Sequence, residues 1–295
     1  MNIIGHARIR DMLRGIASLE ELPHHAFFFF GPDGVGKSLV AEEFASHVLG
    51  YGGEDPNGKQ DFLRIVPEEK KDGKTKKIPV ESIREAGIFL SRFPAEARKR
   101  VVLIEDAQEL SESAQNALLK VFEEPNPTSV IILVASRRGR IRDTIFSRAF
   151  RVPFSTVSED DLRSGAARLF PKADVESLEP FFFSLGRPSL IVGALSDKEA
   201  FAARRDTLRT LFKLSSLSLS ERLSLSERLS GSLPESIRLL EWWLVGLRSM
   251  KTDERNPKRV ASLYRFFDDL EEGIRTLRDT NANARLVIDR IFLSL

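Results

Sequence analysis

The sequence contains no cysteine and only four histidines, and it has no long apolar run. Without cysteine, the chain forms no disulfide and offers no thiolate ligand to a metal ion. The four histidines lie at positions 6, 24, 25 and 47, and no zinc site is expected from them. No apolar run approaches the roughly 18 residues of a membrane-spanning helix, and the first residues, MNIIGHARIRDML, lack the apolar core of a targeting segment. We therefore expect a cytoplasmic protein that does not contact a membrane.

An excess of one charge is also lacking, since the formal net charge is +2. A value so close to zero does not by itself indicate a nucleic-acid partner. Hydrophobic residues make up 42% of the chain and charged residues 30%, which is typical of a soluble globular protein. A chain of 295 residues is long enough for two or three domains with a substantial buried core.

Strand-like and helix-like segments alternate over the first half of the chain. The strand-like segments are short and apolar, which favours strands buried on both faces of a parallel sheet. They are AFFFF at 26–30, VVLI at 101–104, SVIILVAS at 129–136 and RVPF at 151–154. Among the helix-like segments is SESAQNALLKVFEEP, in which Ser111 is the expected N-cap and Pro125 lies beyond the end. The alternation predicts an α/β fold with a doubly wound parallel sheet.

Residues 50–77 interrupt this alternation. They are rich in glycine and charged residues, and we expect a mostly exposed excursion in which FLRIV at 62–66 forms a strand. The segment IPVESIREAGIFLSRF, which follows, has apolar residues at helical spacing and predicts a helix.

After about residue 155 no convincing buried strand remains, and the segments have the pattern of amphipathic helices. We therefore predict three domains: an α/β domain at 1–155, a small helical domain at 156–206 and a second helical domain at 207–295. In the last of these, an immediate repeat of SLSERL predicts a helix with a broad apolar face. That face is formed by the leucines at 219, 223, 225 and 229. Trp242 and Trp243 are expected to pack between helices.

The most specific local signal is GPDGVGKS at residues 31–38, between AFFFF and a helix-like segment. Its glycines let backbone N–H groups turn towards phosphates, and the following helix N-terminus adds partial positive charge. Lys37 is expected to reach the β- and γ-phosphates, and Ser38 to bind Mg²⁺. The pattern predicts that ATP or ADP binds with Mg²⁺. The expected nucleotide-binding residues are Gly31, Asp33, Gly34, Val35, Gly36, Lys37 and Ser38.

Two acidic residues, Glu105 and Asp106, follow the strand VVLI. In the usual arrangement an aspartate comes first and holds the Mg²⁺ shell, and a glutamate follows and activates water. Here the order is reversed, so each carboxylate differs by one methylene from the expected reach. A misplacement near 1 Å costs on the order of 10²-fold in rate, so we expect nucleotide binding without fast hydrolysis. Glu105 is the candidate metal residue beside Ser38, and Asp106 is a weak candidate for the catalytic base.

Five motifs in a fixed order carry a resemblance to a known family: GHARI, LPHHAFFFFGPDGVGKS, VVLIEDAQEL, SAQNALLKVFEEP and TIFSRAF. The chain resembles bacterial clamp-loader AAA+ subunits, and among them the delta-prime subunits of DNA polymerase III. The resemblance covers residues 1 to about 153, and NALLKVFEEP is its most specific part because the family carries a nearly identical helix. It implies an AAA+ P-loop module with a small helical lid, followed by an all-α collar, over the three ranges given above.

In this family, five subunits form a spiral with ATP between neighbours, and an arginine in a Ser-Arg-Cys motif completes the next subunit's site. The sequence Ser147-Arg148-Ala149 matches that motif except for the cysteine. The resemblance therefore implies that Arg148 acts in trans as an arginine finger on a neighbour's γ-phosphate. Ser136 matches the position of the polar sensor. The implied partners are gamma/tau and delta subunits in a hetero-pentamer, the sliding clamp and primed DNA.

Three features depart from the family's motor subunits. Residues 50–77 stand where a four-cysteine zinc module belongs but contain no cysteine, so no zinc is implied. Ser189 stands where a second sensor arginine belongs, and Arg187 lies two positions away. The third departure is the reversed order of Glu105 and Asp106. All three favour the delta-prime role, whereas the intact phosphate loop favours a motor, because some delta-prime subunits have lost theirs.

We expect a component of the DNA-directed DNA polymerase holoenzyme, a nucleotidyltransferase complex, with weak or no ATPase activity of its own. It would bind ATP, present Arg148 to a neighbour and help load the sliding clamp onto primed DNA during replication. One alternative is an ATP-hydrolysing, gamma/tau-like motor subunit of the same loader. The other is an unrelated P-loop kinase, which NALLKVFEEP and the helical C-terminal half disfavour. A basic strip could contact DNA phosphates, with a solvated basic loop as an equal alternative; it consists of Arg137, Arg138, Arg140 and Arg142.

Overall fold

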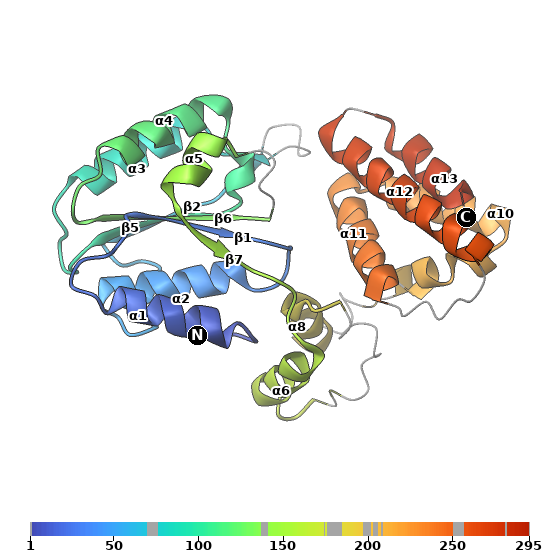
Figure 1. Ribbon diagram of the computed structural model, residues 1–295, viewed down its shortest axis with the longest axis horizontal. Helices are drawn as coiled ribbons and strands as arrows, with labels where there is room; N and C mark the ends of the chain where they lie inside the picture. The colour runs from blue at the N-terminus through green and yellow to red at the C-terminus, as the bar shows by residue number, and fades with distance from the viewer. Residues whose placement is uncertain are drawn as a thin grey trace. The chain divides into compact units, whose positions relative to one another are not determined.

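The computed structural model describes residues 2–69, 76–136, 141–173, 175, 185–196, 202, 206, 207, 209–249, 257–280 and 282–294. The chain divides into two compact units. The first consists of residues 1–173 and 186–190, and the second of residues 174–185 and 191–295. Figure 1 shows the elements of both units. The predicted boundaries of three domains, at residues 155 and 206, stay a prediction.

A five-stranded sheet forms the centre of the first unit, with the strand order β2-β5-β6-β1-β7. Every neighbouring pair is parallel, which confirms the predicted α/β fold (Figure 1). The strands are β1 (Ala26–Phe30), β2 (Phe62–Ile65), β5 (Arg100–Ile104), β6 (Ser129–Ala135) and β7 (Phe150–Pro153). The central strands β5 and β6 are buried along their whole length, as their continuous apolar sequences predict.

Helices cover both faces of this sheet. Figure 1 shows α1 and α2 on one face and α3, α4 and α5 on the other. Their bounds are α1 (Ala7–Ala17), α2 (Lys37–Leu49), α3 (Val80–Ser91), α4 (Glu112–Glu123) and α5 (Asp143–Arg148), with a 3-10 turn η1 (Ala107–Glu109) before α4 and α6 (Glu159–Leu169) after β7. The hydroxyl of Ser111 accepts a hydrogen bond from the N–H of Ala114, so the predicted N-cap of α4 is confirmed.

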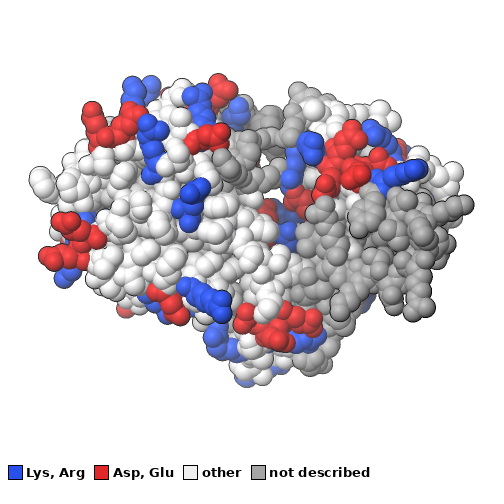
Figure 2. All heavy atoms as spheres, viewed as in Figure 1, with Lys and Arg blue, Asp and Glu red and all other residues white. Residues whose placement is uncertain are grey.

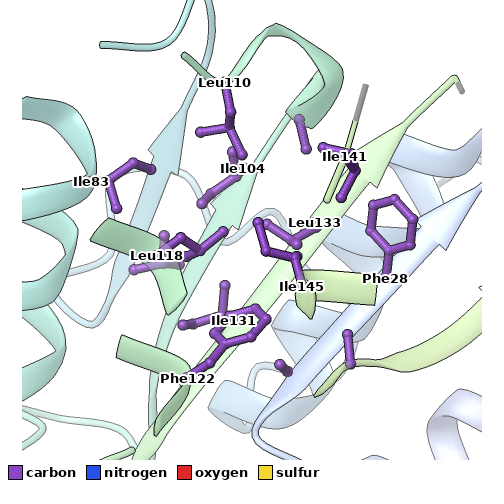
Figure 3. Close-up of a cluster of buried hydrophobic side chains, with 14 of the residues drawn as sticks. Phe28, Ile83, Ile104, Leu110, Leu118, Phe122, Ile131, Leu133, Ile141 and Ile145 are labelled. Atoms are coloured by element: carbon purple, nitrogen blue, oxygen red, sulfur yellow. The ribbon is translucent and has the colours of Figure 1, made fainter. Parts of the chain in front are cut away.

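The four consecutive phenylalanines at the end of β1 divide between the two faces, because side chains alternate along a strand. Phe28 packs in the cluster beneath α3, α4 and α5, where Phe122 of α4 also lies (Figure 3). Phe27 and Phe29 pack in the opposite cluster, which includes Phe44 of α2. The AFFFF strand therefore contributes to both hydrophobic cores, and it fixes the start of the loop that follows it.

Residues 50–77 contribute more to the fold than their composition predicts. The first four residues of FLRIV form β2 at the sheet edge, where Ile65 is buried. Asp61 is wholly buried: its carboxylate accepts hydrogen bonds from the N–H groups of residues 95–97 and pairs with Arg100. The predicted strand is confirmed, and the described residues of the segment are for the most part exposed, as expected. The buried carboxylate of Asp61, which organises a neighbouring loop, was not predicted. The short strands β3 (Glu68–Glu69) and β4 (Lys76–Lys77) pair antiparallel.

The described elements of the second unit are all helical, as predicted. They are η3 (Leu214–Ser216), α10 (Leu219–Ser230), α11 (Leu233–Ser249), α12 (Pro257–Asp279) and α13 (Ala284–Leu293), and α8 (Pro188–Ser196) begins in the first unit and continues into the second. Trp243 is buried and packs edge-on against Phe266 and Phe292, with ring centroids 5.4 and 6.2 Å away. Among the described residues, no helix has the length and apolar character that a membrane span requires.

The SLSERL repeat forms α10, but its apolar face is narrower than predicted. Leu225 and Leu229 are buried, whereas Leu219 is 62% exposed. Leu219 is the first residue of the helix, directly after the N-cap Ser218, and its side chain is left in solvent at the helix end. The expectation that all four leucines pack on one covered face is therefore wrong at Leu219.

Candidate functional site

The predicted site residues follow three adjacent strands. β1 leads into residues 31–38, β5 into Glu105 and Asp106, and β6 into Ser136. Since β5, β6 and β1 are parallel neighbours, these residues meet at one edge of the sheet. Open α/β sheets bind ligands at this carboxyl edge.

Residues 31–38 turn on three glycines with positive φ: 146° at Gly31, 74° at Gly34 and 103° at Gly36. Glycine adopts these angles without the strain that a Cβ causes. A Cβ on Gly31 would lie 2.2 Å from the carbonyl oxygen of Phe154, so the backbone also passes too close there for any other residue. A Cβ on Gly36 would meet nothing within 4 Å. The loop is thus packed on one side and open where α2 begins.

Lys37 is the first residue of α2 and is only 6% exposed. Its Nζ donates a hydrogen bond to the carbonyl oxygen of Pro32 at 2.7 Å. Burial lowers the pKa of Lys37, the carboxylates of Asp33 and Asp106 oppose this shift, and Arg187 adds to it. An ammonium has three donors, so the bond to Pro32 leaves others for phosphate oxygens.

Glu105 connects the loop to the edge of the sheet through charged contacts. The Oγ of Ser38 donates a hydrogen bond to Oε2 of Glu105 at 2.9 Å. The other carboxylate oxygen, Oε1, pairs with Nη2 of Arg64 on β2. Nη1 of Arg64 pairs in turn with Oε1 of Glu42 on α2 at 2.8 Å. The structure therefore brings the predicted metal residues Ser38 and Glu105 together, and it also pairs Glu105 with an arginine.

Sequence reasoning singled out neither Arg64 nor Glu42. The available signal was an arginine inside the apolar stretch FLRIV, which indicates a side chain with a specific partner. The pairing of β2 with β5 brings Arg64 beside its partner Glu105. Burial raises the pKa of Glu42, while Arg64 lowers it and Glu105 raises it. Glu42 therefore lies close enough to the site acid to be influenced by its charge.

A glutamine joins Asp106 to Ser136. Nε2 of Gln108 donates a hydrogen bond to Oδ1 of Asp106 at 2.9 Å, and the N–H of Ser136 donates to Oε1 of Gln108 at 3.1 Å. Asp106 has a left-handed backbone, with φ of 46°. The candidate base and the candidate sensor are thus neighbours through Gln108, which the sequence analysis did not identify.

The start of α8 and the residue before it also reach the loop. Nη1 of Arg187 donates a hydrogen bond to the carbonyl oxygen of Asp33, and the N–H of Ser189 donates to the carbonyl oxygen of Gly34 at 3.1 Å. Arg187 is 4% exposed, and burial lowers its pKa to about 10, with Asp33 opposing the shift. The guanidinium stays protonated at neutral pH. Arg187 lies two positions before the expected position of the sensor arginine in the sequence. The structure places it directly against the phosphate loop.

His6 supports the loop from the N-terminal segment. Its Nε2 lies 2.9 Å from the carbonyl oxygen of Val35, and because a carbonyl only accepts, Nε2 carries the proton. The ring also packs edge-on against Phe154 at 4.8 Å. Burial lowers the pKa of His6, although the bond to Val35 opposes the shift. His6 lies within the GHARI motif, whose individual residues received no role from the sequence.

Arg148 is the last residue of α5, and its side chain is 43% exposed. Nη1 donates a hydrogen bond to the carbonyl oxygen of Thr144 at 3.2 Å, and Nη2 contacts Oε1 of Glu123 at 3.4 Å. The side chain of Glu123 is 56% exposed. The structure therefore holds Arg148 by surface contacts on α5 and α4.

The basic strip is described only in part, because Arg137, Arg138 and Arg140 lie outside the described residues. Nη1 of Arg142 donates a hydrogen bond to Oδ1 of Asn116 at 2.6 Å. On the face of the molecule drawn in Figure 2, basic and acidic side chains of the described residues are intermixed. This face offers no argument for a DNA-binding surface.

The described residues fit the phosphates of a nucleotide. Gly36 faces open space, Lys37 is buried beside it and the N-terminus of α2 supplies partial positive charge. They fit a Mg²⁺ ion less well, because Glu105 is already paired with Arg64. Within the described ranges, no group of three or more His, Cys, Asp or Glu side chains is placed to hold a metal ion. The parallel sheet, the phosphate loop and the helical region define a P-loop protein of the AAA+ class.

Comparison with known proteins places the chain within this class. Residues 5–158 match the family described as DNA polymerase III, delta subunit, and the chain belongs to that family. The DNA polymerase III subunit delta' of Pseudomonas aeruginosa is 26% identical over 285 residues, which cover 89% of this chain and 81% of the relative. Subunit delta' of Haemophilus influenzae is 27% identical over 203 residues, which cover 63% and 59%. The chain is therefore a clamp-loader subunit of the delta-prime type, with a place in DNA replication.

A solved structure supports the same fold over the whole chain. It is that of a DNA polymerase III gamma subunit-related protein from Thermotoga maritima. The match has a TM-score of 0.59 and 20% identity, and it covers 96% of this chain and 97% of the other. At this identity the likeness shows the fold alone, which is an AAA+ module followed by helices.

Proposed function

We propose that this chain is the delta-prime subunit of a cytoplasmic DNA polymerase III clamp loader. It binds ATP or ADP at residues 31–38 and supplies Arg148 in trans to a neighbouring motor subunit. In this role it helps load the sliding clamp onto primed DNA. Its partners are gamma/tau and delta subunits, in a hetero-pentamer. The membership of the delta subunit family supports this proposal, and so does the matching Ser147-Arg148 pair.

The observation that carries the proposal is the placement of Arg148 at the surface. Its only ion pair among the described residues is the 3.4 Å contact with the exposed Glu123. Such surface pairs contribute about 0–1 kcal/mol. A partner's phosphate can therefore take over the guanidinium with little loss, since Arg binds phosphate oxygens through two parallel N–H donors.

The nucleotide site of the chain itself supports binding better than hydrolysis. Lys37 and the backbone of Gly36 would contact the phosphates, and Ser38 and Glu105 would lie next to a bound Mg²⁺ ion. Bound Mg²⁺ supplies charge neutralisation at the β- and γ-phosphates. Glu105 accepts a hydrogen bond from Ser38 and pairs with Arg64, and Asp106 accepts a hydrogen bond from Gln108. Neither acid is set up as a free base for water, and Ser136 would read the γ-phosphate as a sensor.

The test is ATP turnover by a loader reconstituted with motor subunits, clamp and primed DNA. Arg148→Ala is expected to lower turnover at the site that it completes by roughly tenfold or more, because arginine fingers contribute at least this much. Lys37→Ala is expected to have little effect on turnover. Arg163→Ala, which removes an arginine that pairs with Glu159 on α6, is the matched control. A large loss with Lys37→Ala and none with Arg148→Ala would overturn the proposal.

A large loss of turnover with Lys37→Ala and none with Arg148→Ala would favour a motor subunit. The intact phosphate loop is the observation that supports a motor. A subunit that does not hydrolyse ATP does not need the lysine of this loop, yet Lys37 is present and only 6% exposed. Steady-state ATPase activity of the isolated chain distinguishes the two roles, since a motor turns over ATP on its own loop.

A further inference from the structure

Arg64 gives the site a permanent positive charge on the side where Mg²⁺ is expected. Its guanidinium pairs with Glu105 through Nη2 and with Glu42 through Nη1. The side chains of Glu42 and Glu105 are 11% and 15% exposed, so both carboxylates are largely removed from water. An arginine side chain does not deprotonate in proteins, so this positive charge is present at every physiological pH.

The pairing changes what a bound phosphate meets. At an ordinary phosphate loop the site acid is an unpaired carboxylate, and Mg²⁺ cancels its repulsion of the nucleotide. Here Glu105 reaches Ser38 with one oxygen and Arg64 with the other. The two carboxylates and one guanidinium carry one net negative charge in place of two. The negative charge of the acid beside Ser38 is therefore already partly offset before a nucleotide arrives.

The same pairing disfavours the metal. Mg²⁺ sheds its water reluctantly and is usually held by one or two carboxylates together with substrate phosphates. A guanidinium in contact with Glu105 repels a divalent cation and occupies one of the two carboxylate oxygens. The second acid, Asp106, is exposed and accepts a hydrogen bond from Gln108. Glu105 is thus paired with a cation, and one oxygen of Asp106 accepts a hydrogen bond.

We propose that Arg64 takes the electrostatic role that Mg²⁺ has at other phosphate loops, so that this chain binds ATP or ADP with little dependence on Mg²⁺. The inference rests on the proposed binding of a nucleotide at residues 31–38. It assigns Arg64 as a positioning residue that acts through Glu105. A subunit of this kind holds its nucleotide through changes in free Mg²⁺ and lacks the metal geometry that hydrolysis requires.

The experiment is a fluorescence titration of the full chain with an ADP carrying a fluorescent ribose label, in excess Mg²⁺ and in EDTA. The quantity of interest is the ratio of the two dissociation constants. For the natural chain this ratio is expected to stay within about threefold, because Arg64 already offsets part of the negative charge of the two carboxylates. For Arg64→Gln the ratio is expected to rise to about tenfold or more. Without Arg64, only Mg²⁺ offsets the repulsion between the carboxylates of Glu42 and Glu105 and the nucleotide.

Arg64→Lys keeps the charge and is expected to keep the low ratio, which separates charge from packing. Arg163→Gln, which removes an arginine that pairs with Glu159 on α6, is the control for removal of an arginine elsewhere. A natural chain that loses affinity tenfold or more in EDTA overturns this inference but leaves the nucleotide-binding proposal standing. An equal ratio for the natural chain and Arg64→Gln overturns the role of Arg64. No binding with or without Mg²⁺ overturns the proposed function, and this inference with it.

Discussion

Arg187 donates a hydrogen bond to the main-chain carbonyl oxygen of Asp33, a residue 154 positions earlier in the chain. Two residues further on, the N–H of Ser189 bonds to the carbonyl oxygen of Gly34. Arg187 and the first turn of α8 thus fix two consecutive carbonyl groups of the phosphate loop. The loop's conformation therefore depends on a part of the chain that lies far from it in sequence.

Replacement of Arg187 by alanine is expected to weaken nucleotide binding about tenfold. The substitution removes the donor to Asp33 and leaves a partly buried carbonyl unpaired, which costs about 1–3 kcal/mol. Arg187→Lys keeps a cation with a shorter reach, and its nucleotide affinity is expected to lie between those of the natural chain and Arg187→Ala. Circular dichroism checks that each variant is folded, and fluorescence titration measures the affinity. Unchanged affinity in a folded Arg187→Ala protein would show that the loop does not need this contact.

Gly31 and Gly36 are expected to fail in different ways when replaced by alanine. Both have positive φ, which strains an alanine by about 1–3 kcal/mol. At Gly31 the new Cβ would also lie 2.2 Å from a backbone oxygen, so Gly31→Ala should lower the thermal unfolding midpoint clearly more. At Gly36 there is open space, so Gly36→Ala should remain folded but lose nucleotide affinity, because the methyl enters the phosphate position. Equal losses of stability in the two variants would contradict this distinction.

The features that the sequence predicted well are those encoded by neighbouring residues. AFFFF is apolar throughout and SVIILVAS is apolar between its two terminal serines, and such runs form the buried strands of a parallel sheet. The Ser111 cap and the glycine-rich loop are likewise local patterns, in which side-chain chemistry and spacing determine the backbone. The sequence therefore located the strands, the loop and the acids that follow β5.

The features that it missed depend on contacts between distant segments. Asp61 lies in a polar stretch that gives no sign of burial, and only the fold shows the N–H groups of residues 95–97 around it. Arg64 meets Glu105 because β2 pairs with β5, and strand order is not written in the local sequence. The contact of Arg187 with Asp33 likewise requires the chain to return to the loop after α6. Local patterns identified the site's components, and tertiary contacts determine how they are paired.

Glu43 on α2 is held by two arginines from α1, and this triad makes stability depend on pH. Arg10 donates from Nε and Nη2 to the two carboxylate oxygens, and Arg14 donates from Nη2, each at 2.7 Å. The side chain of Glu43 is only 7% exposed. Burial alone would raise the pKa of Glu43, but the hydrogen bonds and charges of Arg10 and Arg14 outweigh it and lower the pKa from 4.5 to about 2.

A carboxylate whose pKa is lower in the folded state stabilises the fold above its unfolded pKa, and it loses this effect as the pH falls through the folded value. The contribution of Glu43 should therefore be complete above about pH 4.5 and disappear towards pH 2. Glu43→Gln is expected to lower the free energy of unfolding at pH 7 by about 2–4 kcal/mol, because two arginines lose their partner. The difference from the natural chain should then shrink between pH 4.5 and pH 2.

Urea unfolding at a series of pH values, followed by circular dichroism, measures this difference. Glu159→Gln, at an exposed pair on α6, should show a small difference that barely changes with pH. A difference for Glu43→Gln that stayed constant or grew on acidification would mean that the triad does not depress this pKa.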